Sequence, residues 1–120
     1  MRIEKDLVAA AATPLVLGIL MDGDLYGYAI LKRVSDLSGG SMQWTDGMLY
    51  PLLHRLERLG YVTSLWGTSD AGRRRKHYAI TDLGREQLAE RQEQWTVVAD
   101  ALRQVWQDRP RPTAVTEGWA

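Results

Sequence analysis

The spacing of apolar residues changes twice along this chain, and this change restricts the fold more than any other feature. Between residues 7 and 59, apolar residues recur at the three- and four-residue intervals typical of helices. Two short runs at residues 61–66 and 76–80 are instead rich in β-branched and aromatic residues, and turn-forming residues separate them. Helical spacing returns from residue 82 to about 106. The pattern predicts a mostly α fold of the α+β class with one small β-hairpin.

Turn and capping residues divide the first stretch into helices. Residues 7–21 form the first predicted helix, which is apolar on nearly every side and has Pro14 as a candidate point of bending. Asp24 is predicted to cap a second helix over residues 26–37, and the Ser-Gly-Gly sequence at 38–40 is predicted to end it.

A third helix is predicted from a cap at Thr45 or Asp46 to residue 59, where Gly60 is a favourable stop. Its inward face is predicted to hold Leu49, Leu52 or Leu53, Leu56 and Leu59. Its other faces carry Tyr50, His54, Arg55 and Arg58. The helix therefore presents a polar and basic surface opposite an apolar stripe.

Thr81 or Asp82 is predicted to open a long fourth helix with an apolar seam. The seam consists of Leu88, Trp95, Val98, Leu102 and Val105. A seam at the end of a 120-residue chain has no obvious partner within that chain, so we expect a homodimer. We therefore predict a domain at residues 1–81, a dimerisation helix at 82–108 and a disordered tail at 109–120.

Composition excludes several classes of protein. The absence of cysteine rules out disulfides, thiolate metal sites and cysteine nucleophiles. The uncharged stretch at 7–21 is shorter than the ~20 residues needed to span a bilayer. Acidic Glu4 and Asp6 precede it, and Asp22-Gly23-Asp24 follows it where a signal peptide has a small-residue cleavage site. The sequence therefore predicts a cytoplasmic protein without membrane contact.

The net charge is zero, but the charges are segregated along the chain. Six lysines or arginines face three acids between residues 44 and 78, whereas six acids face three arginines between residues 82 and 108. Because binding to phosphates needs a local basic surface, the middle segment is the predicted contact for an anionic partner.

Three helices followed by a two-stranded ribbon with a basic loop is the order of a winged helix-turn-helix. Several phrases at the appropriate intervals resemble the PadR family of bacterial transcriptional regulators: Tyr26-Gly27-Tyr28, Leu49-Tyr50-Pro51, Arg55-Leu56-Glu57, Gly72-Arg73-Arg74-Arg75-Lys76-His77-Tyr78 and Thr81-Asp82-Leu83-Gly84-Arg85. The resemblance covers residues 15–106. It implies a winged helix-turn-helix that binds double-stranded DNA, with an added dimerisation helix. One departure is Met48, where the family usually has threonine before Leu-Tyr.

The predicted DNA-binding residues lie on the third helix and the hairpin wing. They are Thr45, Tyr50, His54, Arg58, Arg73, Arg74, Arg75 and Lys76. For the basic run at 73–76, the alternative is a merely solvated hairpin. Glu57 is predicted to have a structural role, such as pairing with a nearby arginine. We predict no metal and no cofactor, since the two histidines lie in different elements.

Trp95 suggests a ligand site at the dimer interface. Some members of the family that this chain resembles have a tryptophan here, lining a cavity that accepts planar aromatic, often cationic, molecules. The predicted effector-binding residues are Leu7, Ala10, Thr13, Leu17, Trp95, Val98 and Leu102. The alternative is that Trp95 packs in a closed interface. Trp66 and Trp106 are assigned to packing.

The sequence therefore predicts a dimeric repressor on a pseudo-palindromic operator, with a planar aromatic ligand as the candidate signal for its release. The rival is a winged-helix protein-interaction module without DNA binding or ligand sensing. An enzyme is not expected, because the chain has no Gly-rich phosphate loop and no recognisable acid-base motif.

Overall fold

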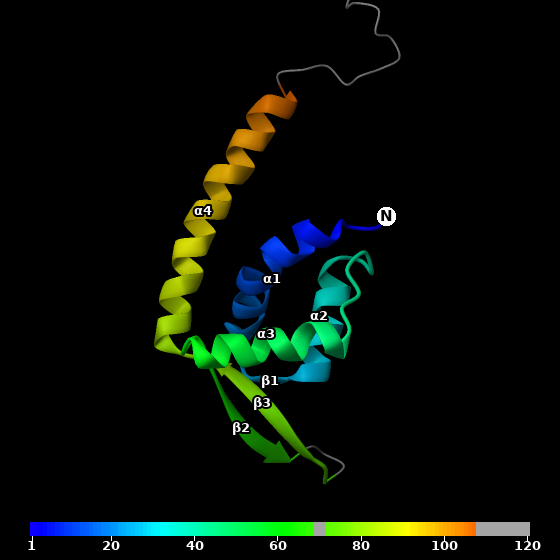
Figure 1. Cartoon of the computed structure of the whole chain (residues 1–120), viewed down its shortest axis with the longest axis vertical. Coiled ribbons are helices and arrows are strands. Elements are labelled where there is room, and N and C mark those ends of the chain that lie inside the picture. Colours follow the sequence, from blue (N-terminus) through cyan, green and yellow to red (C-terminus); the bar gives the residue numbers. More distant parts are fainter. Residues whose placement is uncertain (69–71, 108–120) are drawn as a thin grey trace, which may run out of the picture.

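The computed structural model describes residues 1–68 and 72–107, which form four helices and three strands (Figure 1). In chain order these are α1 (Lys5–Leu20), β1 (Leu25–Tyr26), α2 (Gly27–Leu37), α3 (Asp46–Arg58), β2 (Val62–Thr68), β3 (Arg74–Ile80) and α4 (Asp82–Gln107). Every predicted helix is present, with ends within two residues of those expected. The predicted disordered tail at 109–120 and the centre of the hairpin turn lie outside the described residues.

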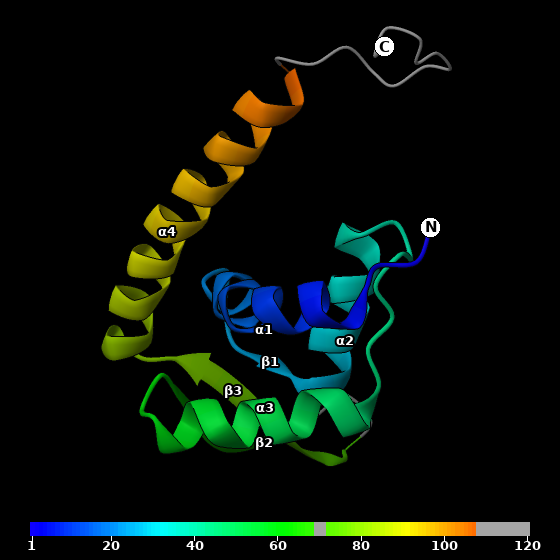
Figure 2. The ribbon, with the colours of Figure 1, turned by 45° about the horizontal axis from the view of Figure 1, so that its top comes forward.

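The core lies where α1, α2 and α3 pack against one another and against β3 (Figure 2). Its fully buried side chains include Val16, Leu17, Ile30, Val34, Leu49, Leu53, Leu56 and Tyr78. Helix α1 remains continuous through Pro14. Its mostly apolar sequence is explained by burial, because its C-terminal half lies inside this core.

The sheet has three antiparallel strands in the order β1-β3-β2. The predicted hairpin of β2 and β3 is confirmed, with Val62 opposite Ile80 and Thr68 opposite Arg74. Strand β1 was not predicted. It pairs Tyr26 with His77, so the residues before α2 are hydrogen-bonded to the wing. Strand β1 therefore connects the start of α2 directly to the wing.

Two junctions fix the long helix to the domain. Gly60 has a φ of +83°, and its N–H and that of Tyr61 bond back to the carbonyls of Glu57 and Leu56, which closes α3 in a Schellman motif. Thr81 accepts a hydrogen bond from the Gly84 N–H and donates one to the Gly60 carbonyl. The stop at Gly60 and the cap at Thr81 are thus as predicted.

Two local predictions were wrong, and a third was confirmed in position only. Asp24 does not cap α2, because β1 occupies the next two residues and the N-cap is Tyr26. Leu59 is 49% exposed, since the chain turns at Gly60 before this side chain can enter the core. Thr45 is the N-cap residue of α3, but its side chain makes no capping hydrogen bond.

Helix α4 leaves the body of the molecule after its first turns (Figure 1). Gly84 and Leu88 are buried against the domain, whereas every residue from 100 to 107 is exposed. The exposed apolar side chains in its second half are Val97, Val98, Leu102, Val105 and Trp106. This half of the helix has no packing partner among the described residues.

Candidate nucleic-acid interface

A hollow of about 550 Å³ lies between the N-terminus of α2, helix α3 and the wing. We call it the basic-aromatic depression. It is lined by Tyr26, Gly27, Tyr28, Tyr50, His54, Trp66, Arg73, Arg74, Arg75, Lys76 and Tyr78. The lining contains three arginines and one lysine and no aspartate or glutamate, so the hollow suits a polyanion.

Tyr50 brings α3 against the start of α2. A Cβ at position 27 would overlap the hydroxyl of Tyr50, so only glycine permits this approach. His54 follows one turn later and is exposed. The two side chains therefore reach the depression from the same side of α3, as the helical spacing predicted.

The wing cations rest on aromatic rings. The guanidinium carbon of Arg75 lies 4.4 Å from the ring centroid of Tyr26, and that of Arg74 lies 5.0 Å from the ring of Trp66. Cation-π contacts of this kind restrict the arginine side chains without neutralising them. The charges are thus held at the surface before any partner arrives.

A hydrogen bond joins the wing to α3. The hydroxyl of Ser64 donates to the Glu57 carboxylate over 2.6 Å. Glu57 is therefore structural, as expected, but its partner is a serine and not an arginine. Burial raises the pKa of Tyr78 above its usual 10.0, and Tyr50 and Glu57 add to the shift.

Six of the eight predicted DNA-binding residues line the depression: Tyr50, His54, Arg73, Arg74, Arg75 and Lys76. Thr45 lies outside this lining at the start of α3, and Arg58 lines a different hollow. The aromatic members Tyr26 and Tyr28 were not predicted as site residues, although their Tyr-Gly-Tyr phrase is part of the family resemblance. Trp66 was wrongly assigned to packing, since it is 61% exposed beneath Arg74.

The predicted effector-binding residues divide into two groups. Leu7, Ala10, Val98 and Leu102 are exposed, and Trp95 is half-buried on the side of α4 that carries Leu88. Thr13 is buried, and Leu17 is fully buried in the core. Leu17 therefore cannot line a cavity between subunits in this arrangement, because its own chain already encloses it.

Neither a metal cluster nor a membrane-spanning helix is found in the described part of the chain. In residues 1–68 and 72–107, no three His, Asp or Glu side chains are grouped as metal ligands. Within the same ranges, no helix is both long and apolar enough to cross a membrane.

Comparison with known proteins identifies the family. The sequence profile of the Transcriptional regulator PadR-like family matches residues 16–90. The chain belongs to the PadR-like family. The matched segment contains α2, α3 and the wing, which are the elements that build the depression.

Solved PadR-like structures have the same architecture. A PadR-like transcriptional regulator from Bacillus cereus superimposes with a TM-score of 0.77 at 27% identity, covering 86% of this chain and 98% of that one. A PadR family regulator from Eggerthella lenta gives 0.74 at 32% identity, covering 87% and 88%. The predicted fold class is confirmed by this likeness.

A curated relative, the transcriptional regulator YqjI of Escherichia coli, is 27% identical over 88 residues. These residues are 73% of this chain and 41% of YqjI, so this PadR-like chain spans less than half of that relative. An uncharacterised protein of Lysinibacillus sphaericus is 28% identical over 100 residues, which are 83% of this chain and 92% of that protein. Membership of this family makes the protein a transcriptional regulator and not an enzyme.

Proposed function

We propose that this PadR-like protein is a repressor that binds double-stranded DNA through the basic-aromatic depression and the exposed face of α3. The observation that carries the proposal is the depression itself. It unites the start of α2, helix α3 and four consecutive wing cations in one surface. Phosphates would lie along the wing and α2, while Tyr50 and His54 reach toward base edges in the major groove.

A homodimer would give this surface its sequence specificity. The exposed apolar side chains of α4 favour association with a second copy, because such a row is rarely left in water on a small monomer. Two copies related by a twofold axis would place their α3 helices in successive major grooves, about 34 Å apart on a pseudo-palindromic operator.

The same dimer would form a site for a planar aromatic ligand beside Trp95. Leu7 and Ala10 of α1 and Val98 and Leu102 of α4 are exposed and available to complete it. Such a ligand lowers DNA affinity only if it prefers a dimer geometry that fits the operator poorly. A closed interface around Trp95 is the alternative.

Salt dependence of DNA binding tests the proposal. A duplex selected by the wild-type protein from a random-sequence pool is titrated by fluorescence anisotropy at several salt concentrations. The double substitution Arg74→Gln and Arg75→Gln is expected to weaken binding. It should also lower the slope of log affinity against log salt by about 0.9 for each phosphate that the variant no longer neutralises.

The matched control is the double substitution Arg85→Gln and Arg103→Gln in α4. It changes the net charge by the same amount as the wing variant, but at a distance from the depression. It is expected to leave the slope unchanged. Equal losses of DNA affinity in both variants would show that binding depends on the net charge of the protein and not on the position of the arginines in the depression. If no duplex is selected, or if reversing the wing charges leaves regulation intact, the rival protein-interaction module is favoured.

A further inference from the structure

Four exposed residues follow one another along the outward side of α3: Gly47, Pro51, His54 and Arg58. At ~100° per residue they fall within a sector of about 60° around the helix axis. The fully buried leucines of the same helix lie on the opposite side: Leu49, Leu53 and Leu56. We call the four exposed residues the α3 ridge. It is the part of the helix that points most directly away from the core.

The two halves of the α3 ridge differ in chemistry. Gly47 has no side chain, and Pro51 has an apolar ring and no backbone N–H. His54 and Arg58 instead carry nitrogen atoms that form hydrogen bonds. At 1.5 Å per residue, Pro51 and Arg58 lie about 10.5 Å apart along the helix. This is roughly three times the ~3.4 Å rise of a DNA base pair, so the two halves would face different base pairs.

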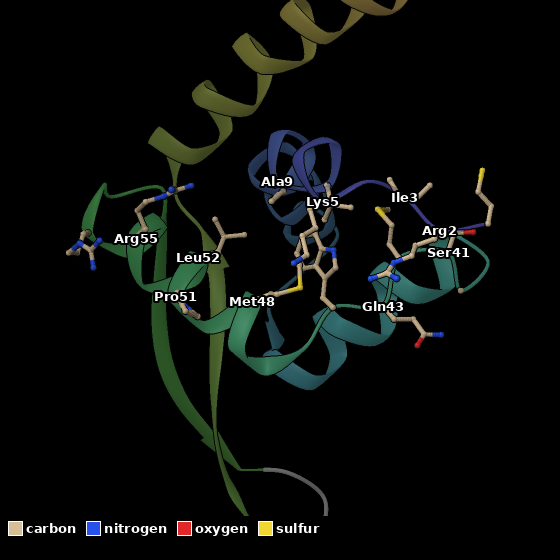
Figure 3. Close-up of a pocket in the computed structure, with 17 residues that line it drawn as sticks. Arg2, Ile3, Lys5, Ala9, Ser41, Gln43, Met48, Pro51, Leu52 and Arg55 are labelled. Carbon is tan, nitrogen blue, oxygen red and sulfur yellow. The ribbon is translucent and has the colours of Figure 1, made fainter.

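The first half of the ridge is open to a close approach. Neighbouring residues and the helix backbone aside, only the Thr45 hydroxyl lies within 4 Å of a Cβ added at Gly47, at 3.7 Å. Pro51, one turn later, is therefore the first side chain to project from the ridge. Met48 lies on the flank of α3, about 90° from the middle of the ridge. It extends into a hollow of about 1020 Å³ beside the helix, which Pro51 and Arg58 also border (Figure 3).

An apolar ring distinguishes base pairs in the major groove by one feature. Every pair presents hydrogen-bonding groups there, but only thymine adds a C5-methyl group. Pro51 offers no donor or acceptor to a base edge, so a cytosine amino group or a guanine carbonyl placed against it would lose water without gaining a hydrogen bond. A thymine methyl group placed against the same ring buries apolar surface instead. The chemistry of Pro51 therefore favours thymine.

We propose that Pro51 is a specificity-determining residue that contacts the C5-methyl group of one thymine in each operator half-site. Gly47 allows α3 to come close enough for this contact, and His54 and Arg58 supply the hydrogen bonds at the other end of the ridge. The proposal rests on the DNA binding put forward above and deepens it by naming a base that α3 reads. By twofold symmetry the contact occurs once in each half-site.

Replacement of thymine by deoxyuridine tests the contact, because it removes the methyl group and leaves the hydrogen-bonding groups in place. In the duplex selected by the wild-type protein, each thymine of one half-site is replaced in turn, together with its symmetry mate. Affinity for the full chain is measured by fluorescence anisotropy. One position is expected to weaken binding about fourfold per half-site, the factor for burying one methyl group.

The same duplexes are then measured with Pro51→Ala, which removes the outer carbons of the ring and introduces a residue that favours helices. The deoxyuridine penalty at that position is expected to fall below about 1.5-fold per half-site, since most of the buried contact is gone. The matched control is Met48→Ala, which removes an apolar side chain from the flank of the same helix. It should keep the full penalty, whatever its effect on overall affinity. Unfolding midpoints in urea verify that both variants are folded.

The outcomes separate the methyl contact from DNA binding itself. A penalty that persists in Pro51→Ala, or that is lost equally in Met48→Ala, would overturn the contact, because another residue or the shape of the DNA then senses the methyl group. A wild-type protein without a penalty at any thymine, or a selected duplex without thymine in its half-sites, would overturn the contact and leave DNA binding by α3 standing. Failure to select any duplex would overturn both.

Discussion

Arg75 of the wing lies over the ring of Tyr26, the residue immediately before α2, with 4.4 Å between guanidinium carbon and ring centroid. The same tyrosine pairs with His77 through β1 and β3, so one residue fixes both the backbone and a cation of the wing. The arginine is thereby directed before DNA binds. Preorganisation of this kind improves affinity because less side-chain freedom is lost on binding.

We therefore predict that Tyr26→Leu weakens binding to the selected duplex about 2–5-fold. This factor corresponds to the loss of a cation-π contact worth ~0.5–1 kcal/mol at an exposed site. The control is a double-mutant cycle with Arg75→Gln, measured by anisotropy at one salt concentration. If Tyr26→Leu costs as much in the Arg75→Gln background as in the wild type, the tyrosine acts independently of the arginine.

Gly84 is predicted to be intolerant of alanine. A Cβ there would overlap the carbonyl oxygen of Tyr61, which is backbone and cannot rotate away. Gly84→Ala should lower the free energy of unfolding by about 1–3 kcal/mol in urea denaturation. Gly18→Ala is the matched control, since nothing lies within 4 Å of its added Cβ, and it should stabilise α1 by about 0.5–1 kcal/mol. Similar effects of the two substitutions would contradict the packing described for α4.

Thr81 is predicted to stabilise the α4 junction through its hydroxyl. That hydroxyl accepts from the Gly84 N–H over 3.0 Å and donates to the Gly60 carbonyl over 2.6 Å. Thr81→Val should cost about 1–2 kcal/mol, in the range measured for removal of an N-cap. Thr63→Val, at an exposed position on β2, should change stability little. Equal unfolding midpoints in the two variants would show that the cap contributes nothing.

Stability is predicted to fall at alkaline pH through Tyr78. Its pKa is raised in the folded protein, chiefly by burial, so the unfolded chain loses the proton first. The contribution is complete below the unfolded pKa near 10 and is lost as the pH rises toward the folded value. Urea unfolding at pH 7, 9 and 10.5 should show a steeper decline for the wild type than for Tyr78→Phe. Parallel declines would assign the effect to other groups.

Trp95 is predicted to respond to flat cationic aromatic dyes. Saturable quenching of tryptophan fluorescence is expected in the wild type and in Trp66→Ala, whose indole lies on the exposed wing. It should disappear in Trp95→Ala with the dimer retained. Quenching that survives in Trp95→Ala would place the dye elsewhere, and no quenching in any protein would favour a closed interface.

The helices and the hairpin could be predicted because their signals are local. Gly60 ends α3 because glycine readily adopts a positive φ, and Thr81 begins α4 because its hydroxyl caps the helix. The spacing of the leucines in α3 indicates which face is buried. Strand β1 could not be found in this way. Two residues have no periodicity, and Leu25 and Tyr26 are extended only because β3 is there to pair with them.

The candidate site was partly predictable for the same reason. The basic run of the wing is visible in the sequence, but the aromatic rings beneath Arg74 and Arg75 come from β2 and β1 and meet them only in the folded chain. Likewise, Arg58 shares a helix with His54, yet it lines a different hollow and not the basic-aromatic depression. Helical spacing alone did not separate these two sides of α3.

Because α4 is held to the domain only near Thr81 and Gly84, a small change of angle at this junction moves the far end of the helix by a large distance. The helix has 26 residues and is therefore about 39 Å long, so a tilt of about 10° at its base displaces its far end by roughly 7 Å. That displacement is twice the rise of one DNA base pair, roughly 3.4 Å. In the proposed dimer, a change of one or two side chains where α4 meets Tyr61 would therefore alter the separation of the two α3 helices, while every residue proposed to face DNA stays the same.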